Sequence, residues 1–105
     1  MAKLIYSQRA LDDLVRLTDF LLASDVAAAA ATIDLIDEAV GVLARHPLIG
    51  RCVEQGLREL VISRGHTGYL ALYSFEEDHD AVLILAVRHQ RELGYGEADE
   101  SKDAS

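Results

Sequence analysis

The segment AVLILAVRHQRE, residues 81–92, changes character abruptly along its length. Its first seven residues are all apolar and rich in valine, leucine and isoleucine, which is typical of a strand that is buried on both faces. Such a strand lies in the middle of a sheet, so we expect neighbouring strands on both of its sides. The segment then becomes basic and titratable at Arg88, His89 and Arg91. We therefore predict that these three side chains emerge at the end of a central strand, where they can meet anionic groups.

Two further strands are predicted before this one. The segments LRELVIS (57–63) and YLALYSF (69–75) are rich in β-branched, leucine and aromatic residues, and the sequence GHTG between them favours a turn. The polar segment EEDHD (76–80) separates the second of them from the strand at 81–89. Connections this short cannot carry a parallel crossover, so the three strands are predicted to form an antiparallel meander.

The first half of the chain is predicted to be helical after one short strand at AKLIYS, residues 2–7. Ser7 can cap a helix from about Gln8 to Ala23, and Asp25 can cap a second helix from about Val26 to Arg45. A proline two residues later ends the second helix, because the residue before a proline avoids the helical region. The predicted order is strand, helix, helix, strand, strand, strand, which makes one small α+β domain.

The apolar residues of the two helices predict which faces are buried. In the first helix the apolar face comprises Leu11, Leu14, Val15, Thr18, Leu21 and Leu22. The opposite side carries Asp12, Asp13, Arg16 and Asp19. In the second helix the buried stripe comprises Ile33, Ile36, Val40 and Leu43. Three apolar residues lie off these stripes and are predicted to be exposed, so that the isolated chain self-associates unless a partner covers it: Leu17, Phe20 and Val42.

Length and apolar content limit the domain organisation. The chain of 105 residues suffices for one domain, which we place at residues 1–95, and the acidic tail at 96–105 is predicted to be disordered. Half of the residues are apolar, but no apolar run approaches the roughly twenty residues of a membrane span. A single cysteine, Cys52, excludes an internal disulfide and favours a reducing, cytoplasmic location.

Charge and motif content limit the function. The net charge of −8 argues against high-affinity binding of nucleic acid by the chain alone. The sequence contains no cysteine–histidine spacing typical of zinc and no glycine-rich phosphate loop. Neither a metal nor a cofactor is therefore predicted.

The predicted order of elements, together with three motifs, resembles the RelE/ParE family of bacterial toxins from type II toxin–antitoxin systems. The motifs are ARHPLIGR (44–51), LRELVISRGHTGYLALYSF (57–75) and VLILAVRHQRELGY (82–95). The HPxxGR turn and the strand that ends in VRHQRE are most similar to the ParE-like branch, often described as plasmid-stabilisation proteins. This resemblance implies that an antiparallel helical hairpin packs on a twisted antiparallel sheet, and that a cognate antitoxin is encoded alongside.

The resemblance leaves three functions open. ParE-like members act on DNA gyrase, whereas RelE-like members are ribosome-dependent endoribonucleases that cleave mRNA. A third possibility is a degenerate member that binds its antitoxin without toxicity. RelE-like nucleases usually carry a basic residue after the tyrosine of the middle strand, but here Tyr69 is followed by Leu70, and the only lysines are Lys3 and Lys102. We therefore favour a gyrase-directed, non-enzymatic toxin that forms a homodimer or a heterotetramer with its antitoxin.

Several residues carry the predicted site, and each has an alternative role. The residues predicted to bind the target or the antitoxin are Arg64, Tyr69, Arg88, His89 and Arg91; those that a nuclease would use are Arg64, Arg88, His89 and Tyr95. An acidic antitoxin segment would pair with the arginines. Alternatively the arginines bind Glu59 or Glu92, His89 is a packed histidine, and Tyr69 belongs to the core.

Overall fold

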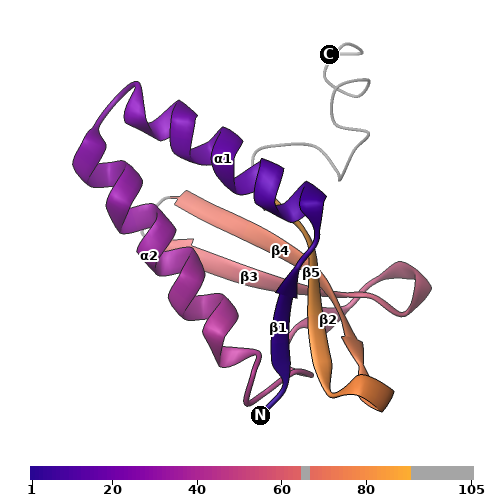
Figure 1. Ribbon diagram of the computed structural model, residues 1–105. Coiled ribbons are helices and arrows are strands. Elements are labelled where there is room, and N and C mark those ends of the chain that lie inside the picture. Colours follow the sequence, from indigo (N-terminus) through magenta and orange to yellow (C-terminus); the bar gives the residue numbers. More distant parts are fainter. Residues whose placement is uncertain (65–66, 91–105) are drawn as a thin grey trace, which may run out of the picture.

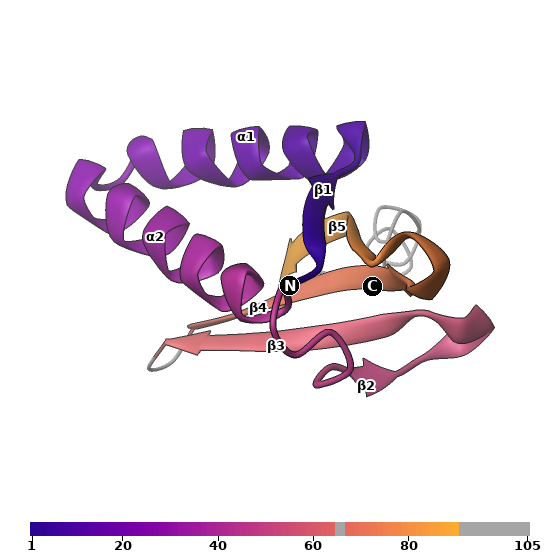
Figure 2. The ribbon, with the colours of Figure 1, turned by 60° about the horizontal axis from the view of Figure 1, so that its bottom comes forward.

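The computed structural model describes residues 1–64 and 67–90, in which two helices cover one face of a five-stranded sheet (Figure 1). The strands are β1 (Lys3–Tyr6), β2 (Arg51–Cys52), β3 (Arg58–Arg64), β4 (Thr67–Glu76) and β5 (Ala81–His89). The helices are α1 (Gln8–Leu22) and α2 (Val26–Val42), and two short 3₁₀ turns lie at Glu54–Gly56 and Glu77–His79. In the turned view of Figure 2, both helices lie on the same side of the sheet and form one layer.

The order of the strands across the sheet is β1-β5-β4-β3-β2. Strand β5 therefore lies between two neighbours, as its apolar sequence predicts. It runs antiparallel to β4, which in turn runs antiparallel to β3, so the predicted meander is confirmed. Strand β1 adds to the other edge of β5 in parallel, with Tyr6 opposite Ile84. The two-residue strand β2 was not predicted, because its sequence lies in a segment punctuated by proline and glycine.

Both helices begin at the predicted caps. The Ser7 hydroxyl accepts a hydrogen bond from the Ala10 amide at 3.1 Å, and the Asp25 carboxylate accepts one from the Ala27 amide at 2.9 Å. Helix α2 ends at Val42, three residues earlier than predicted, and the chain continues as a tight turn toward the proline. The Ser7 hydroxyl also donates to the Leu85 carbonyl at 3.1 Å, so the start of α1 is tied to β5.

The predicted orientation of α1 was wrong, whereas that of α2 is largely confirmed. Leu11 and Val15, expected in the core, are 44% and 60% exposed, and Leu17, expected at the surface, is only 4% exposed. The residues of α1 that are buried are Ala10, Asp13 and Leu17. Phe20 is exposed as predicted. The helix is therefore rotated relative to the predicted apolar face, and this rotation buries Asp13, whose contact is described below.

The core lies between the helices and the inner face of the sheet, and Tyr73 extends it to the turn that follows α2. Tyr73 is fully buried, and its hydroxyl donates to the Pro47 carbonyl at 2.7 Å and accepts from the Gly50 amide at 2.9 Å. Burial is the main cause that raises the pKa of Tyr73 above its ordinary value. The Tyr73 hydroxyl thus holds the HPxxGR turn at both Pro47 and Gly50.

Candidate functional site

Four of the predicted site residues belong to strands that end at the same end of the sheet. Tyr69 of β4 lies opposite His89 of β5, and the next pair along is Leu70 with Arg88. At the same end, the backbone of Arg64 in β3 pairs with Thr67, two residues along from the Ile62–Tyr69 pair. The side chain of Arg64 lies outside the described part of the structure, as do Arg91 and Tyr95.

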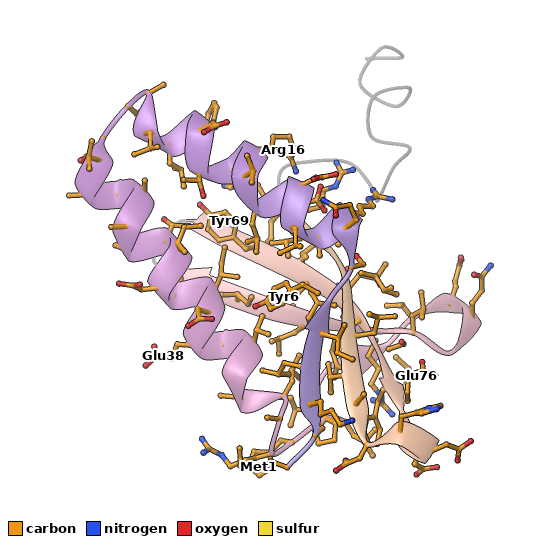
Figure 3. The ribbon with its side chains drawn as sticks, viewed as in Figure 1. Met1, Tyr6, Arg16, Glu38, Tyr69 and Glu76 are labelled. Carbon is orange, nitrogen blue, oxygen red and sulfur yellow. The ribbon has the colours of Figure 1, made fainter. Side chains whose placement is uncertain are left out.

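His89 lies on the face of the sheet that the helices cover. Its ring meets the Tyr69 ring edge to face, with centroids 5.2 Å apart and an interplanar angle of 83°. Tyr69 is only 3% exposed and belongs to the core, and Figure 3 places it on the helix side of the sheet. Tyr69 therefore supports His89 from the core and presents almost no surface of its own to a partner.

Arg88 lies on the opposite, uncovered face. Successive residues of a strand point to opposite faces, and across β4 and β3 the neighbours of Arg88 are Leu70 and then Val61. Val61 is 45% exposed, which marks this face as open. Arg88 itself is partly buried, and its Nε atom is inaccessible to solvent. The predicted cluster of Arg88 and His89 is therefore divided between two faces of one strand.

Asp13 is a residue of this region that the sequence did not reveal. Strand β1 ends opposite Ile84, so among residues 1–64 and 67–90 no strand pairs with the outer edge of β5 beyond that point. The buried Asp13 carboxylate takes the place of a strand there, because its Oδ2 accepts a hydrogen bond from the Val87 amide at 2.9 Å. Its other oxygen lies 3.7 Å from the Arg16 guanidinium. Asp13 thus fixes β5 immediately before Arg88 and His89.

Replacing Asp13 with leucine should lower the free energy of unfolding by about 2–3 kcal/mol, because a charge-assisted hydrogen bond is lost and the Val87 amide stays buried without its acceptor. Asp13→Asn keeps an acceptor oxygen and should retain more than half of that stability. The matched control is Asp12→Leu, since Asp12 is exposed on the same helix. Urea unfolding of the three variants checks this; equal losses for Asp12→Leu and Asp13→Leu would show that the Val87 contact contributes nothing.

Glu59 has a well-defined role in the fold. It is buried, and its Oε1 accepts from the Nε of Arg51 at 2.9 Å across the β2–β3 pair. Arg58 extends in the other direction and donates to the carbonyls of Leu48 and Gly50 at 3.1 and 2.8 Å. These two arginines hold the segment between α2 and β3 in place, so they act in the architecture of the sheet edge.

Within residues 1–64 and 67–90, no group of three or more histidine, cysteine, aspartate or glutamate side chains is arranged to hold a metal ion. In the same part of the chain no helix is both long enough and apolar enough to cross a membrane.

The family follows from comparison with known proteins. A family model described as the ParE toxin of the type II toxin–antitoxin system parDE matches residues 4–94. The chain belongs to this ParE toxin family. A curated relative of the ParE-family chain, Toxin RelE3 of Caulobacter vibrioides, is 40% identical over 84 residues, which cover 80% of the chain and 89% of that relative.

Solved structures share the fold of the ParE-family chain. The chromosomal ParDE toxin–antitoxin system from P. aeruginosa gives a TM-score of 0.70 at 22% identity, covering 85% of this chain and 96% of that one. The toxin–antitoxin complex RelBE2 from Mycobacterium tuberculosis gives a TM-score of 0.56 at 28% identity, covering 85% and 98%. The predicted helical hairpin on a sheet is confirmed, with the parallel strand β1 added to it.

Proposed function

We propose that this chain is a ParE-like toxin that is neutralised by a cognate antitoxin and acts by binding DNA gyrase, without breaking a bond itself. The observation that carries the proposal is the placement of Arg88 and His89 on opposite faces of β5. With His89 turned to the helix-covered face and Arg88 to the open face, a partner can contact Arg88 without an acid–base group beside it.

Cleavage of RNA would require a different arrangement of side chains. A base near the 2′-hydroxyl, an acid near the leaving oxygen and cations around the phosphate must converge on one small volume. Here His89 faces Tyr69 and the core, Arg88 faces away, and the position after Tyr69 holds Leu70 in place of a cation. This arrangement of described residues favours recognition over acid–base catalysis.

The second candidate is a RelE-like, ribosome-dependent endoribonuclease. Its support is the relative named Toxin RelE3, which shares 40% identity with this chain. Two residues that a nuclease would use, Arg91 and Tyr95, lie outside the described residues. The test below therefore measures both activities.

The antitoxin partner is supported by the apolar surface of α1. Leu11, Val15 and Leu22 lie on one side of α1 and are 44–60% exposed, which forms an apolar surface on that side of the helix. Beside it, an open groove of about 230 Å³ runs between β1, α1 and α2 and is lined in part by Tyr6, Leu11 and Ile33. Several of the solved structures that share the fold are complexes of a toxin with its antitoxin. We propose that an apolar antitoxin segment covers this surface and that an acidic one reaches the arginines.

The test is controlled expression in bacteria, with and without the antitoxin encoded beside the toxin, followed by two assays on the purified chain. We expect growth arrest with filamentation, rescue by the antitoxin, and inhibition of supercoiling by gyrase without cleavage of mRNA on ribosomes. Codon-specific cleavage of mRNA with intact supercoiling would replace the proposal by the nuclease. Antitoxin binding without any growth arrest would identify a degenerate member.

A further inference from the structure

The groove between β1, α1 and α2 has an apolar base and one acidic wall. Its deepest residues are Tyr6, which is half-buried, and Ile36, which is only 1% exposed. Leu11 lines the groove on the side of α1, and Asp34 and Asp37 line it on the side of α2. Both aspartates are exposed, and their spacing of three residues places them on one face of α2. A segment that enters this groove therefore meets apolar side chains below it and two carboxylates beside it.

The two carboxylates lack a positive partner in the described part of the chain. Within residues 1–64 and 67–90, no arginine, lysine or histidine side chain forms an ion pair with Asp34 or Asp37. Asp34 also lies one helical turn from Glu38, and like charges at that spacing destabilise a helix. Burial, and then the charge of Asp37, raises the pKa of the Tyr6 hydroxyl, so the negative charge is felt at the base of the groove.

The whole helical hairpin is acidic. Residues 8–42 contain two arginines against seven acidic residues, and one of these arginines, Arg16, already lies 3.7 Å from the Asp13 carboxylate. The apolar surface of α1 that the antitoxin is proposed to cover is therefore surrounded by negative charge. An acidic segment, of the kind expected at the arginines, would be repelled here, whereas a basic one would be attracted.

We propose that the groove binds an amphipathic segment of the antitoxin in which a lysine or arginine side chain faces Asp34 and Asp37. The inference rests on the proposed function, since the antitoxin is the occupant, and it adds the chemistry that the occupant must have. Apolar side chains of the segment pack on Leu11 and Tyr6, and the cation at its edge binds the carboxylates. Antitoxin residues of opposite sign then meet the helices and the arginines, which fixes the direction in which the antitoxin lies on the toxin.

The test is surface plasmon resonance of the full chain against the antitoxin encoded beside it. Asp34→Asn and Asp37→Asn each remove one charge with little change in size, and each should weaken binding about tenfold. The double variant should weaken it by roughly a hundredfold. Glu38→Gln is the matched control, because it removes a charge from the side of α2 that faces away from the sheet (Figure 3). It should change the affinity by no more than about twofold.

The thermal midpoint of each free variant separates weaker binding from misfolding. Asp34→Asn removes the repulsion from Glu38, so its midpoint should equal or exceed that of the wild type while its affinity for the antitoxin falls. A structural role of Asp34 would instead lower both quantities.

Charge reversal identifies the partner side chain. Asp37→Lys should still arrest growth in bacteria but should escape rescue by the antitoxin. Among antitoxin variants in which each lysine or arginine in turn is replaced by glutamate, one should rescue Asp37→Lys, because it restores a pair of opposite charges.

Unchanged antitoxin affinity in the double variant overturns this inference and leaves the proposed function in place. So does a set of antitoxin variants in which no replaced lysine or arginine rescues Asp37→Lys. Loss of growth arrest in the double variant with unchanged antitoxin binding also overturns it, and would assign the groove to the target. A chain that binds its antitoxin through the two aspartates but never arrests growth supports the inference and contradicts the proposed toxicity. A wild-type chain that does not bind the antitoxin overturns both.

Discussion

Replacing Gly50 with alanine should lower the free energy of unfolding by about 3 kcal/mol, which is a large part of the stability of a domain of this size. A Cβ atom at Gly50 would lie 2.6 Å from the Tyr73 hydroxyl oxygen, 2.7 Å from its ring and 2.9 Å from the Glu59 carbonyl oxygen. Tyr73 is fully buried and Glu59 contributes backbone of a strand, so neither can move away cheaply. The substitution also displaces the Gly50 amide from the Tyr73 hydroxyl that accepts its hydrogen bond.

Urea unfolding followed by circular dichroism measures this loss of stability. Two further variants separate the steric clash from the loss of the hydrogen bond. Gly41→Ala is the matched control, because a Cβ atom there meets nothing within 4 Å, and it should be neutral or stabilising. Tyr73→Phe leaves the Gly50 amide without its acceptor but introduces no clash, so it should cost only about 1–2 kcal/mol. If Gly50→Ala unfolds at the same urea concentration as the wild type, the turn between α2 and β2 is not held by Tyr73.

The strands could be predicted because the apolar content of each segment and the length of the turns between them indicate where each strand lies in the sheet. The segment at 81–87 contains no polar side chain, and such a segment is stable only between other strands and under a layer of helices. The short turns before β4 and β5 then leave antiparallel pairing as the sole arrangement. The pairing of β1 with β5 depends on contacts about 80 residues apart, which no local pattern records.

The orientation of α1 could not be predicted, since its apolar residues extend around much of the helix. Leu11 and Val15 are as apolar as Leu14 and Leu17, so periodicity allowed more than one buried face. The observed orientation buries Asp13 together with Ala10 and Leu17, and the partner of Asp13 is the backbone amide of a residue 74 positions away. Asp13 follows Asp12 on a helix, a pattern typical of a solvent-exposed face, so the sequence did not predict its burial. The burial is favourable because β1 ends opposite Ile84, and the Asp13 carboxylate then accepts the hydrogen bond of the Val87 amide.

The sequence located Arg88 and His89 at the end of the last strand, but it did not predict that the two side chains point to opposite faces of the sheet. The basic run after β5 located the end, and β5 remains a strand as far as His89. Because the strand continues through Arg88 and His89, strand alternation separates them, whereas a loop there could have brought them together. The extent of the strand is set by its pairing with β4 up to Tyr69, which is a tertiary contact.

The placement of Arg88 and His89 on opposite faces of β5 leads to the prediction with the largest expected effect. It concerns the two residues separately. If the chain binds its target as proposed, Arg88→Ala should weaken binding of gyrase or antitoxin by about 2–5 kcal/mol, or tens- to thousands-fold, because a charged contact is lost in an enclosed interface. His89→Gln keeps a hydrogen-bonding side chain of similar size that cannot take up a proton, and it should preserve toxicity. Arg9→Ala, at an exposed position of α1, is the control for the loss of one positive charge.

The same pair of variants behaves in the opposite way if His89 performs acid–base chemistry on the ribosome. His89→Gln should then lower mRNA cleavage by roughly 10²–10⁴-fold while ribosome binding persists. The loss of the edge-to-face contact with Tyr69 affects stability equally under both mechanisms, so thermal unfolding of His89→Gln must be measured beside each activity. A folded His89→Gln variant that still arrests growth and inhibits supercoiling, beside an Arg88→Ala variant that does neither, would establish recognition through the open face of β5. A folded His89→Gln variant that has lost mRNA cleavage would instead place the chemistry on the helix-covered face, where the Tyr69 ring holds the imidazole.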